Sequence, residues 1–189
     1  MTTETRPVHT LPVEPLTAEA FAPFGVVLSP RGRERLPINT YGDRLNLFRE
    51  GFETDQPIEW FIVEGHRRPM QALFLERHRQ LTQAFIPMNG DGFVTIVARP
   101  DAQEHYGMIA LAEMRAFHVP GDAAIQIHRG TWHENPFPLR DGQWFLVTSH
   151  AALTLGHQKN PSHALQGLPL DLERRWFKDA AFDVRTDAA

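Results

Sequence analysis

Short apolar runs separated by turn residues make up most of this chain. Runs of strand length cover residues 24–28, 60–63, 73–75, 84–88, 93–98, 123–127 and 144–148. The 15 prolines and 13 glycines are scattered along the chain, which favours many turns and disfavours long helices. The pattern therefore predicts an all-β fold, a barrel or a sandwich, with a few short helices.

Two turns stand out between these runs. Residues 88–93, with the sequence Met-Asn-Gly-Asp-Gly-Phe, predict a hairpin between the runs at 84–88 and 93–98. Residues 120–122, with the sequence Pro-Gly-Asp, predict a second turn that leads into the strand carrying Gln126 and His128. Near the start of the chain, Thr17 is a good N-cap for a short helical turn.

The end of the chain differs from the rest. Residues 1–160 are predicted to form a single barrel domain, and residues 161–189 a C-terminal arm. Within the arm, Leu172 and Trp176 lie four residues apart, which would place them on one face of a helix. We therefore expect a short helix in this arm.

Composition narrows the range of functions. A formal net charge of −4 without basic runs argues against nucleic acid and anionic membranes as partners. No apolar run approaches the roughly 20 residues that span a bilayer, and residues 1–7 lack the apolar core of a signal peptide, so a cytoplasmic protein is expected. The lack of cysteine excludes disulfides and thiolate chemistry, and leaves ten histidines as nitrogen ligands for a metal.

Two short motifs carry residues typical of a metal site. In the first, Glu76 and His78 alternate along a strand, so both side chains point to the same face, and Gln83 and Gly90 follow. In the second, residues 130–133, with the sequence Gly-Thr-Trp-His, place an imidazole just after a tight turn. The pair resembles the two metal-binding motifs of cupin-type barrels. This resemblance implies a cupin-like β-barrel with Glu76, His78, Gln83 and His133 as metal ligands.

Each of these residues also has an alternative interpretation. His78 and His133 are either ligands or core histidines that bond to the backbone, and Gln83 either binds the metal or orients amide groups of a substrate. His128 is a ligand, a proton carrier or a structural residue. Arg77 is out of phase with Glu76, so it lies on a solvated face, at a subunit interface, or against a substrate carboxylate. Nickel, manganese, iron and zinc all suit such oxygen and nitrogen ligands.

Longer stretches resemble the ureidoglycolate lyase family, cupin-like enzymes that split ureidoglycolate into glyoxylate and urea. The stretches are Leu75-Glu76-Arg77-His78, Thr82-Gln83-Ala84-Phe85-Ile86-Pro87, Met114-Arg115-Ala116-Phe117 and His128-Arg129-Gly130-Thr131-Trp132-His133. The resemblance implies a carbon–nitrogen lyase of the amidine-lyase type that acts on a small molecule, with nickel as the favoured metal. In that enzyme His128 and Glu76 would be catalytic, and Gln83, Gln126 and Arg77 would bind the substrate. A homodimer is also expected, because barrels of this type commonly pair through open sheet edges.

The chain departs from the family pattern at three places. Gln126 stands where the family usually has Asn, and Glu134 and Asn135 intervene before the proline that usually follows Trp-His. The last strand ends in Thr148-Ser149-His150 instead of Asp-Arg. Two other classes therefore remain: another metal-dependent cupin enzyme acting on a small hydroxy- or keto-acid, and a ligand sensor without activity. Release of urea distinguishes the lyase from both.

Overall fold

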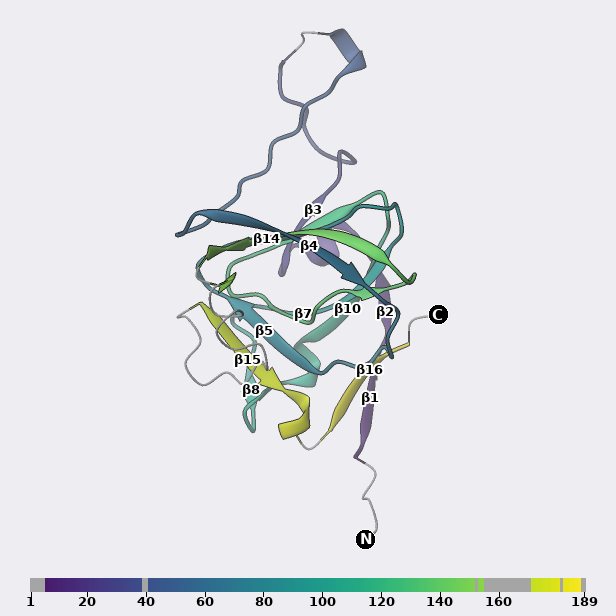
Figure 1. Ribbon diagram of the computed structural model, residues 1–189, viewed down its shortest axis with the longest axis vertical. Helices are drawn as coiled ribbons and strands as arrows, with labels where there is room; N and C mark the ends of the chain where they lie inside the picture. Colours follow the sequence, from purple (N-terminus) through teal and green to yellow (C-terminus); the bar gives the residue numbers. More distant parts are fainter. Residues whose placement is uncertain (1–5, 39–40, 152, 155–170, 181, 188–189) are drawn as a thin grey trace.

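Strands dominate the structure, a computed structural model that describes residues 6–38, 41–151, 153–154, 171–180 and 182–187. Figure 1 shows them wrapped around one interior. The strands are β1 (Val8–Leu11), β2 (Val13–Pro15), β3 (Gly25–Leu28), β4 (Ile58–Gly65), β5 (Phe74–His78), β6 (Gln83–Pro87), β7 (Phe93–Ala98), β8 (Glu104–His105), β9 (Met108–Ile109), β10 (Met114–Val119), β11 (Ala124–Ile127), β12 (Trp132–His133), β13 (Phe137–Pro138), β14 (Gln143–His150), β15 (Leu172–Trp176) and β16 (Asp183–Thr186). The short helices include α1 (Ala18–Phe21) and the 3-10 helices η1 (Gly42–Arg44), η2 (Leu111–Glu113) and η3 (Phe177–Asp179).

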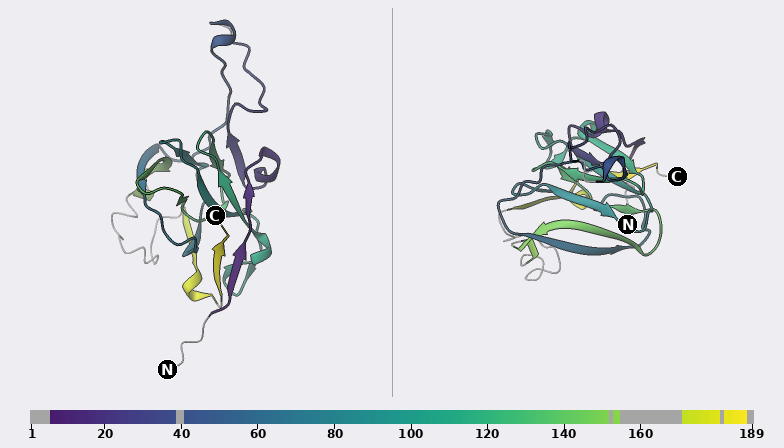
Figure 2. Two further views of the ribbon diagram at one scale, coloured as in Figure 1. Left: turned by 90° about the vertical axis from the view of Figure 1, so that its right-hand side faces the viewer. Right: turned by 90° about the horizontal axis from the view of Figure 1, so that it is seen from above.

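Two sheets form the wall of the barrel. The larger sheet has the order β15-β5-β12-β7-β10-β2, with β13 paired to β7, and the smaller has the order β3-β11-β6-β14-β4. Seen from above in Figure 2, the sheets lie one over the other and enclose the interior. Helix α1 begins at the predicted cap, where the Thr17 Oγ1 accepts a hydrogen bond of 3.1 Å from the Ala20 N–H. The predicted all-β barrel with a few short helices is confirmed.

Strand β7 is buried along its whole length because both faces of the larger sheet are covered. Phe93 and Val97 point between the two sheets and share a core cluster with Phe145 of the smaller sheet. Ile96 points the other way, into a second cluster that includes Phe177 near the end of the chain. A strand in this sheet therefore has one face toward the barrel interior and one toward the second cluster.

The turn at residues 88–93 is present, but the predicted hairpin is wrong. Gly90 has a φ of +75°, which a glycine adopts without strain. However, β6 belongs to the smaller sheet and β7 to the larger one, so the turn carries the chain from one sheet to the other. The second predicted turn packs against it, since a Cβ on Gly121 would lie 1.8 Å from the Gly90 carbonyl oxygen. The absence of a side chain at Gly121 therefore lets the two turns touch.

The predicted helix at the end of the chain is also wrong. Residues Leu172–Trp176 form β15, an edge strand that pairs antiparallel with β5 and places Arg174 opposite Glu76. Beyond it, β16 pairs in parallel with β1 near the start of the chain. The part of the predicted arm at residues 161–170 lies outside the described residues, and the division of the chain at residue 160 stays a prediction.

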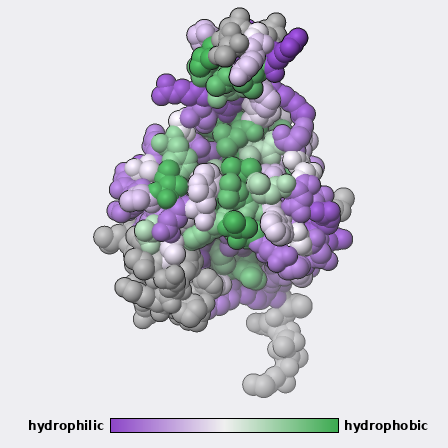
Figure 3. Space-filling view, turned by 45° about the horizontal axis from the view of Figure 1, so that its top comes forward, coloured by the Kyte–Doolittle hydropathy of each residue, from purple (hydrophilic) through white to green (hydrophobic). Residues whose placement is uncertain are grey.

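Apolar side chains are exposed at two places outside the core. The residues between β3 and β4 extend away from the barrel (Figures 1 and 2), and there Tyr41 and Leu45 are 65% and 50% exposed. On the edge strand β4, Trp60 and Ile62 are 54% and 76% exposed. Figure 3 looks onto this side and shows apolar residues gathered in the middle of the face. Among the described residues, no helix has the length and apolar character needed to cross a bilayer.

Candidate metal centre and active-site cavity

The larger sheet brings Glu76, His78 and His133 together. Alternation along β5 turns Glu76 and His78 toward the barrel interior, and β12 places His133 directly opposite Glu76 in the strand register. Between the two motifs, the Gly130 N–H donates to the His78 carbonyl oxygen at 2.6 Å, and Gly130 has a φ of +78°. The turn before β12 is thereby fixed to the end of β5, and the predicted grouping of these three side chains is confirmed.

The ligand atoms of these three side chains surround one point. The Glu76 Oε1 lies 3.9 Å from the His78 Nε2 and 3.8 Å from the His133 Nε2, and the three ligand atoms lie within 4.8 Å of one another. The His133 Nδ1 lies 3.1 Å from the Thr131 carbonyl oxygen, to which it donates when it carries the proton. That tautomer leaves the lone pair of the Nε2 directed at the group.

Several buried polar atoms in this group lack a hydrogen-bond partner among the described residues. They are both ring nitrogens of His78, the Nε2 of His133 and the Oε1 of Gln83. Gln83 begins β6 and is held by its amide, whose Nε2 donates to the Thr148 carbonyl oxygen at 3.2 Å. Buried acceptors without a donor are costly in an apolar interior. A metal ion would satisfy one nitrogen of each imidazole and the Gln83 oxygen, so the residues present fit a metal.

The protonation states of His78, His133 and Glu76 suit these side chains to bind a metal. Burial lowers the pKa of His78 to about 4, and burial likewise lowers the pKa of His133, so both imidazoles are neutral near pH 7. Burial alone would raise the pKa of Glu76, but His78, His133 and Arg174 together hold it below its usual value. One carboxylate and two neutral imidazoles form a donor set that divalent transition metals accept.

The structure adds one charged residue that sequence reasoning missed. Arg174 on β15 donates from its Nε to the Glu76 Oε2 at 2.8 Å, and its Nη2 donates to the same oxygen. Its guanidinium carbon lies 4.2 Å from the centre of the Phe74 ring. The alternation of Leu172, Arg174 and Trp176 is the sequence signal for a strand at this position, where a helix was predicted.

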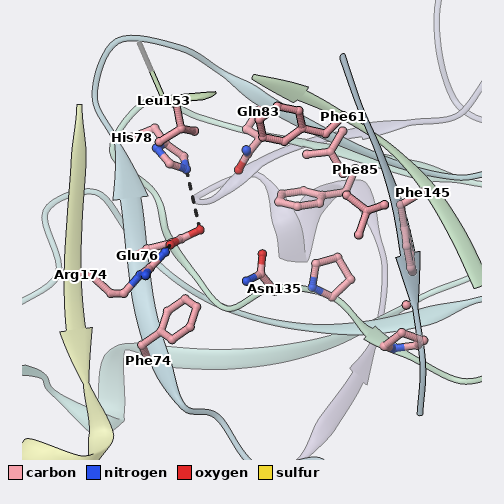
Figure 4. Close-up of a pocket in the computed structure, with 15 residues that line it drawn as sticks. Phe61, Phe74, Glu76, His78, Gln83, Phe85, Asn135, Phe145, Leu153 and Arg174 are labelled. Atoms are coloured by element: carbon pink, nitrogen blue, oxygen red, sulfur yellow. Dashed lines mark hydrogen bonds and ion pairs between the residues drawn. The ribbon is translucent and has the colours of Figure 1, made fainter. Parts of the chain in front are cut away.

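Beside this group lies a cavity of about 240 Å³ whose walls are mostly apolar. Figure 4 shows Glu76, His78, Gln83 and Arg174 on one side of it, with Phe61, Phe85 and Phe145 opposite and Asn135 below. Glu76 is the one carboxylate and Arg174 the one guanidinium among the described residues that line it. The other lining residues are Val63, Gly65, Phe74, Pro136, Pro138, Val147 and Leu153.

Glu134, one of the two residues that depart from the family pattern after His133, supports the wall of this cavity. Its Oε2 accepts hydrogen bonds from the N–H groups of Leu73 and Phe74 at 2.8 and 3.2 Å. Arg68 pairs with the other oxygen at 3.4 Å. Burial nevertheless raises the pKa of Glu134. The carboxylate thus fixes the start of β5, two residues before Glu76.

Three residues predicted for the site do not reach the cavity. Gln126 is buried on the other face of its strand, where its Nε2 donates to the Gly51 carbonyl oxygen at 2.6 Å. Arg77 faces away from Glu76 and pairs with Glu173 at 2.6 Å. His128 is exposed, and its Nε2 lies 3.2 Å from the Ala22 carbonyl oxygen. The strand phase of these three residues was predicted correctly, but the barrel closes so that their side chains point away from the cavity.

His128 lines a different and more open pocket, together with Arg33 and Glu50. It is absent from both the group of ligand atoms and the lining of the cavity beside it. Its predicted part as a proton carrier has no geometric support in this arrangement.

The family model and the similar sequences agree on one family. A family model described as ureidoglycolate lyase matches residues 8–181. The chain is 34% identical over 184 residues to a ureidoglycolate lyase of Brucella melitensis biotype 2, which covers 95% of this chain and 96% of that protein. It is 35% identical over 149 residues to a ureidoglycolate lyase of Pseudomonas paraeruginosa, covering 76% of this chain and 85% of that one. Among solved structures, RmlC from Streptococcus suis in complex with dTDP-D-xylose has 12% identity and a TM-score of 0.35, covering 67% of this chain and 60% of that one.

Proposed function

We propose that this chain, which belongs to the ureidoglycolate lyase family, splits ureidoglycolate into glyoxylate and urea at a divalent metal held by Glu76, His78, Gln83 and His133. The observation that carries the proposal is the buried group of ligand atoms within 4.8 Å of one another, placed at the wall of a small apolar cavity. Because the bond broken joins carbon to the nitrogen of a urea group, the enzyme is a carbon–nitrogen lyase of the amidine-lyase type.

The reaction sets clear demands on the site. The substrate carbon carries a hydroxyl, a carboxylate and a urea nitrogen, so cleavage needs the hydroxyl proton removed and the departing nitrogen protonated. When bound, a divalent metal supplies a Lewis acid that stabilises negative charge on oxygen. No water takes part as a nucleophile, and the phenylalanine side chains of the cavity keep water away from the reacting atoms.

Glu76 is the group we assign to proton transfer. It is the one carboxylate lining the described part of the cavity, and carboxylates are among the side chains that serve as general acids and bases. In the proposed cycle, Glu76 takes the hydroxyl proton as the carbonyl forms and gives it to the urea nitrogen as the carbon–nitrogen bond breaks. The carboxylate is regenerated, and one proton has moved from oxygen to nitrogen.

We propose nickel as the metal, because the donor set of one carboxylate, two imidazoles and an amide oxygen accepts it and the family resemblance favours it. The predicted alternative, another metal-dependent enzyme acting on a small hydroxy- or keto-acid, has no support from the comparisons.

Metal analysis of the protein purified without added metal, paired with an assay of urea release, tests the function. The His78→Ala variant is expected to lose metal and activity together while circular dichroism shows an intact barrel. Wild-type protein that binds metal and releases no urea from ureidoglycolate would refute the substrate. Full metal occupancy in His78→Ala would remove His78 from the ligand set.

The homodimer and the cytoplasmic location also belong to this proposal. Support for a dimer comes from the exposed Trp60 and Ile62 on β4, because an apolar edge strand is an aggregation hazard unless it is covered. Light scattering at micromolar concentration would show a mass of twice 21.6 kDa if the dimer forms. A monomer under these conditions would refute it.

A further inference from the structure

Arg174 has one donor group that the protein does not use. Its side chain is 2% exposed, and its Nε and Nη2 both donate to the Glu76 Oε2. The remaining nitrogen, Nη1, is buried and has no hydrogen-bond partner among the described residues. The face of the guanidinium lies against the Phe74 ring, which offers no acceptor in the plane of the group. A buried guanidinium nitrogen without an acceptor is costly, so its retention in a cavity wall points to an acceptor that arrives with a ligand.

The charge balance of the cavity says what kind of acceptor fits. The charges of Glu76 and Arg174 cancel, and no other carboxylate, lysine or arginine side chain of the described residues lines the cavity. A resident divalent metal would then leave two unbalanced positive charges in a mostly apolar space. An anionic ligand would be stabilised there, and a neutral ligand of the same shape much less.

We propose that Arg174 binds the carboxylate of the substrate through Nη1 and makes the cavity selective for carboxylates over neutral analogues. The inference rests on the proposed function, since it places the carboxylate end of a hydroxy-acid beside Arg174. Guanidinium suits this task because it offers parallel donors in one plane, so it holds Glu76 with one edge and presents another to the ligand. The remaining polar groups of the cavity wall, on Gln83 and Asn135, are neutral amides and provide no such charge.

The position of Arg174 is fixed by a second buried pair. The His150 Nε2 lies 2.6 Å from the Asp171 Oδ2, and both side chains are within 1% of full burial. The other oxygen of Asp171 accepts from the N–H groups of Arg79 and Gln80 at 2.6 Å each. Asp171 thereby ties the start of β15 to the turn after β5. His150, at the end of β14, thus helps to anchor the strand that carries Arg174.

The test compares two ligands that differ in one charge. Glycolate and glycolamide share a hydroxyl and nearly the same shape, but only glycolate carries a carboxylate. Calorimetry on metal-loaded protein gives the ratio of their dissociation constants, and metal content is measured on the same samples. We expect Arg174→Gln to reduce the preference for glycolate by roughly ten- to a hundredfold, the value of a charge-assisted hydrogen bond. With ureidoglycolate, KM should rise far more than kcat falls, because the carboxylate is held in ground and transition state alike.

Arg175→Gln is the matched control. Arg175 is the next residue on β15, points to the opposite face and pairs with Glu104 at 3.2 Å, so its loss should leave the ratio unchanged. Arg174→Lys keeps the positive charge beside Glu76 and should retain metal while losing part of the preference. If Arg174→Gln loses its metal, the preference for glycolate is measured in Arg174→Lys instead.

An unchanged preference in a metal-loaded Arg174 variant would overturn the proposal, as would an equal loss of affinity for both ligands, which indicates a structural role. The two ligands need no turnover. Suppose that the wild-type protein releases no urea, but that the Arg174 variants lose the wild-type preference for glycolate. These two results together would refute the proposed reaction and still support the carboxylate site.

Discussion

The two faces of the β5–β15 strand pair carry the same charges in reversed order. On the inner face Glu76 lies opposite Arg174, and on the outer face Arg77 lies opposite Glu173. The inner side chains are 9% and 2% exposed, whereas the outer ones are 11% and 34% exposed. Strand pairing places both pairs equally well, so the pairing alone does not distinguish a functional pair from a structural one.

The surroundings make the difference. Glu173 on the outer face is shared with Arg79 at 2.7 Å, and Arg77 stacks on Trp132 with its guanidinium carbon 4.2 Å from the ring centre. In the inner pair, the Glu76 Oε1 instead lies 3.9 and 3.8 Å from the unpaired Nε2 atoms of His78 and His133, and the Arg174 Nη1 has no hydrogen-bond partner among the described residues. We therefore assign a functional role to Glu76, which lies beside unsatisfied ligand atoms. Glu173, which lies near solvent and contacts a second arginine, stabilises the sheet instead.

The sharpest way to break this comparison is to neutralise one carboxylate at a time. Glu76→Gln leaves the charge of Arg174 buried and unpaired, so the metal-free protein should lose roughly 3–5 kcal/mol of unfolding free energy. Glu173→Gln should cost about 1 kcal/mol or less, because that pair is partly solvated. Urea release should fall roughly a hundred- to ten-thousandfold in Glu76→Gln and stay near the wild-type rate in Glu173→Gln.

Denaturant titrations of both variants after chelation supply the free energies, and the urea assay supplies the rates. Equal losses of stability in the two variants would contradict the difference drawn between the faces.

The two faces should also respond to different ranges of pH. The folded pKa of His78 is about 4 against 6.5 when unfolded, so the unfolded chain binds more protons between these values. The stability of the metal-free protein should therefore fall as the pH drops from 6.5 toward 4, by about 3 kcal/mol for this group. The pKa of Glu173 is lowered because the hydrogen bonds from Arg77 and Arg79 outweigh its burial, so its contribution is present above pH 4.5 and is lost only below that value.

Unfolding free energies measured across this range should show a slope above pH 4.5 that is absent from His78→Gln. A slope that persists in this variant would assign the proton uptake to another group, with His133 the next to examine, since burial lowers its pKa as well.

The smallest effect on turnover is expected from a substitution of His128, and this variant sharpens the comparison with His133. His133 is 1% exposed and lies in the group of ligand atoms, whereas His128 is exposed and bonded to the Ala22 carbonyl oxygen. His128→Asn should change turnover by no more than about twofold, the usual size for a surface substitution. A fall of roughly a hundredfold with full metal content would instead restore His128 as a proton carrier.

The metal site was largely predictable because its information is local. Alternation placed Glu76 and His78 on one face, and the turn at Gly130 placed His133 just beyond, so only the pairing of two strands remained to be supplied by the fold. For Gln126 and Arg77, the alternation along each strand was predictable, but the face that points into the barrel was not. That choice depends on how the sheets close, and both faces of these strands are buried.

Arg174 could not be found in the same way. Leu172 and Trp176, spaced four apart, share a face in a strand as well as in a helix, so their spacing did not distinguish the two. What makes this segment a strand is its pairing with β5, nearly a hundred residues earlier in the chain. Such pairing is non-local, and the alternation of Leu172, Arg174 and Trp176 is only a weak signal of it within the segment.

Because β15 comes from the end of the chain, the order of synthesis matters for this protein. Glu76, His78 and His133 leave the ribosome well before Arg174, so for a time the growing chain contains the ligands without the arginine that holds the carboxylate. During that interval β5 is also an unpaired sheet edge. Addition of β15 closes the edge and completes the cavity wall, so the open cluster of ligands becomes a selective pocket only after this late strand has paired.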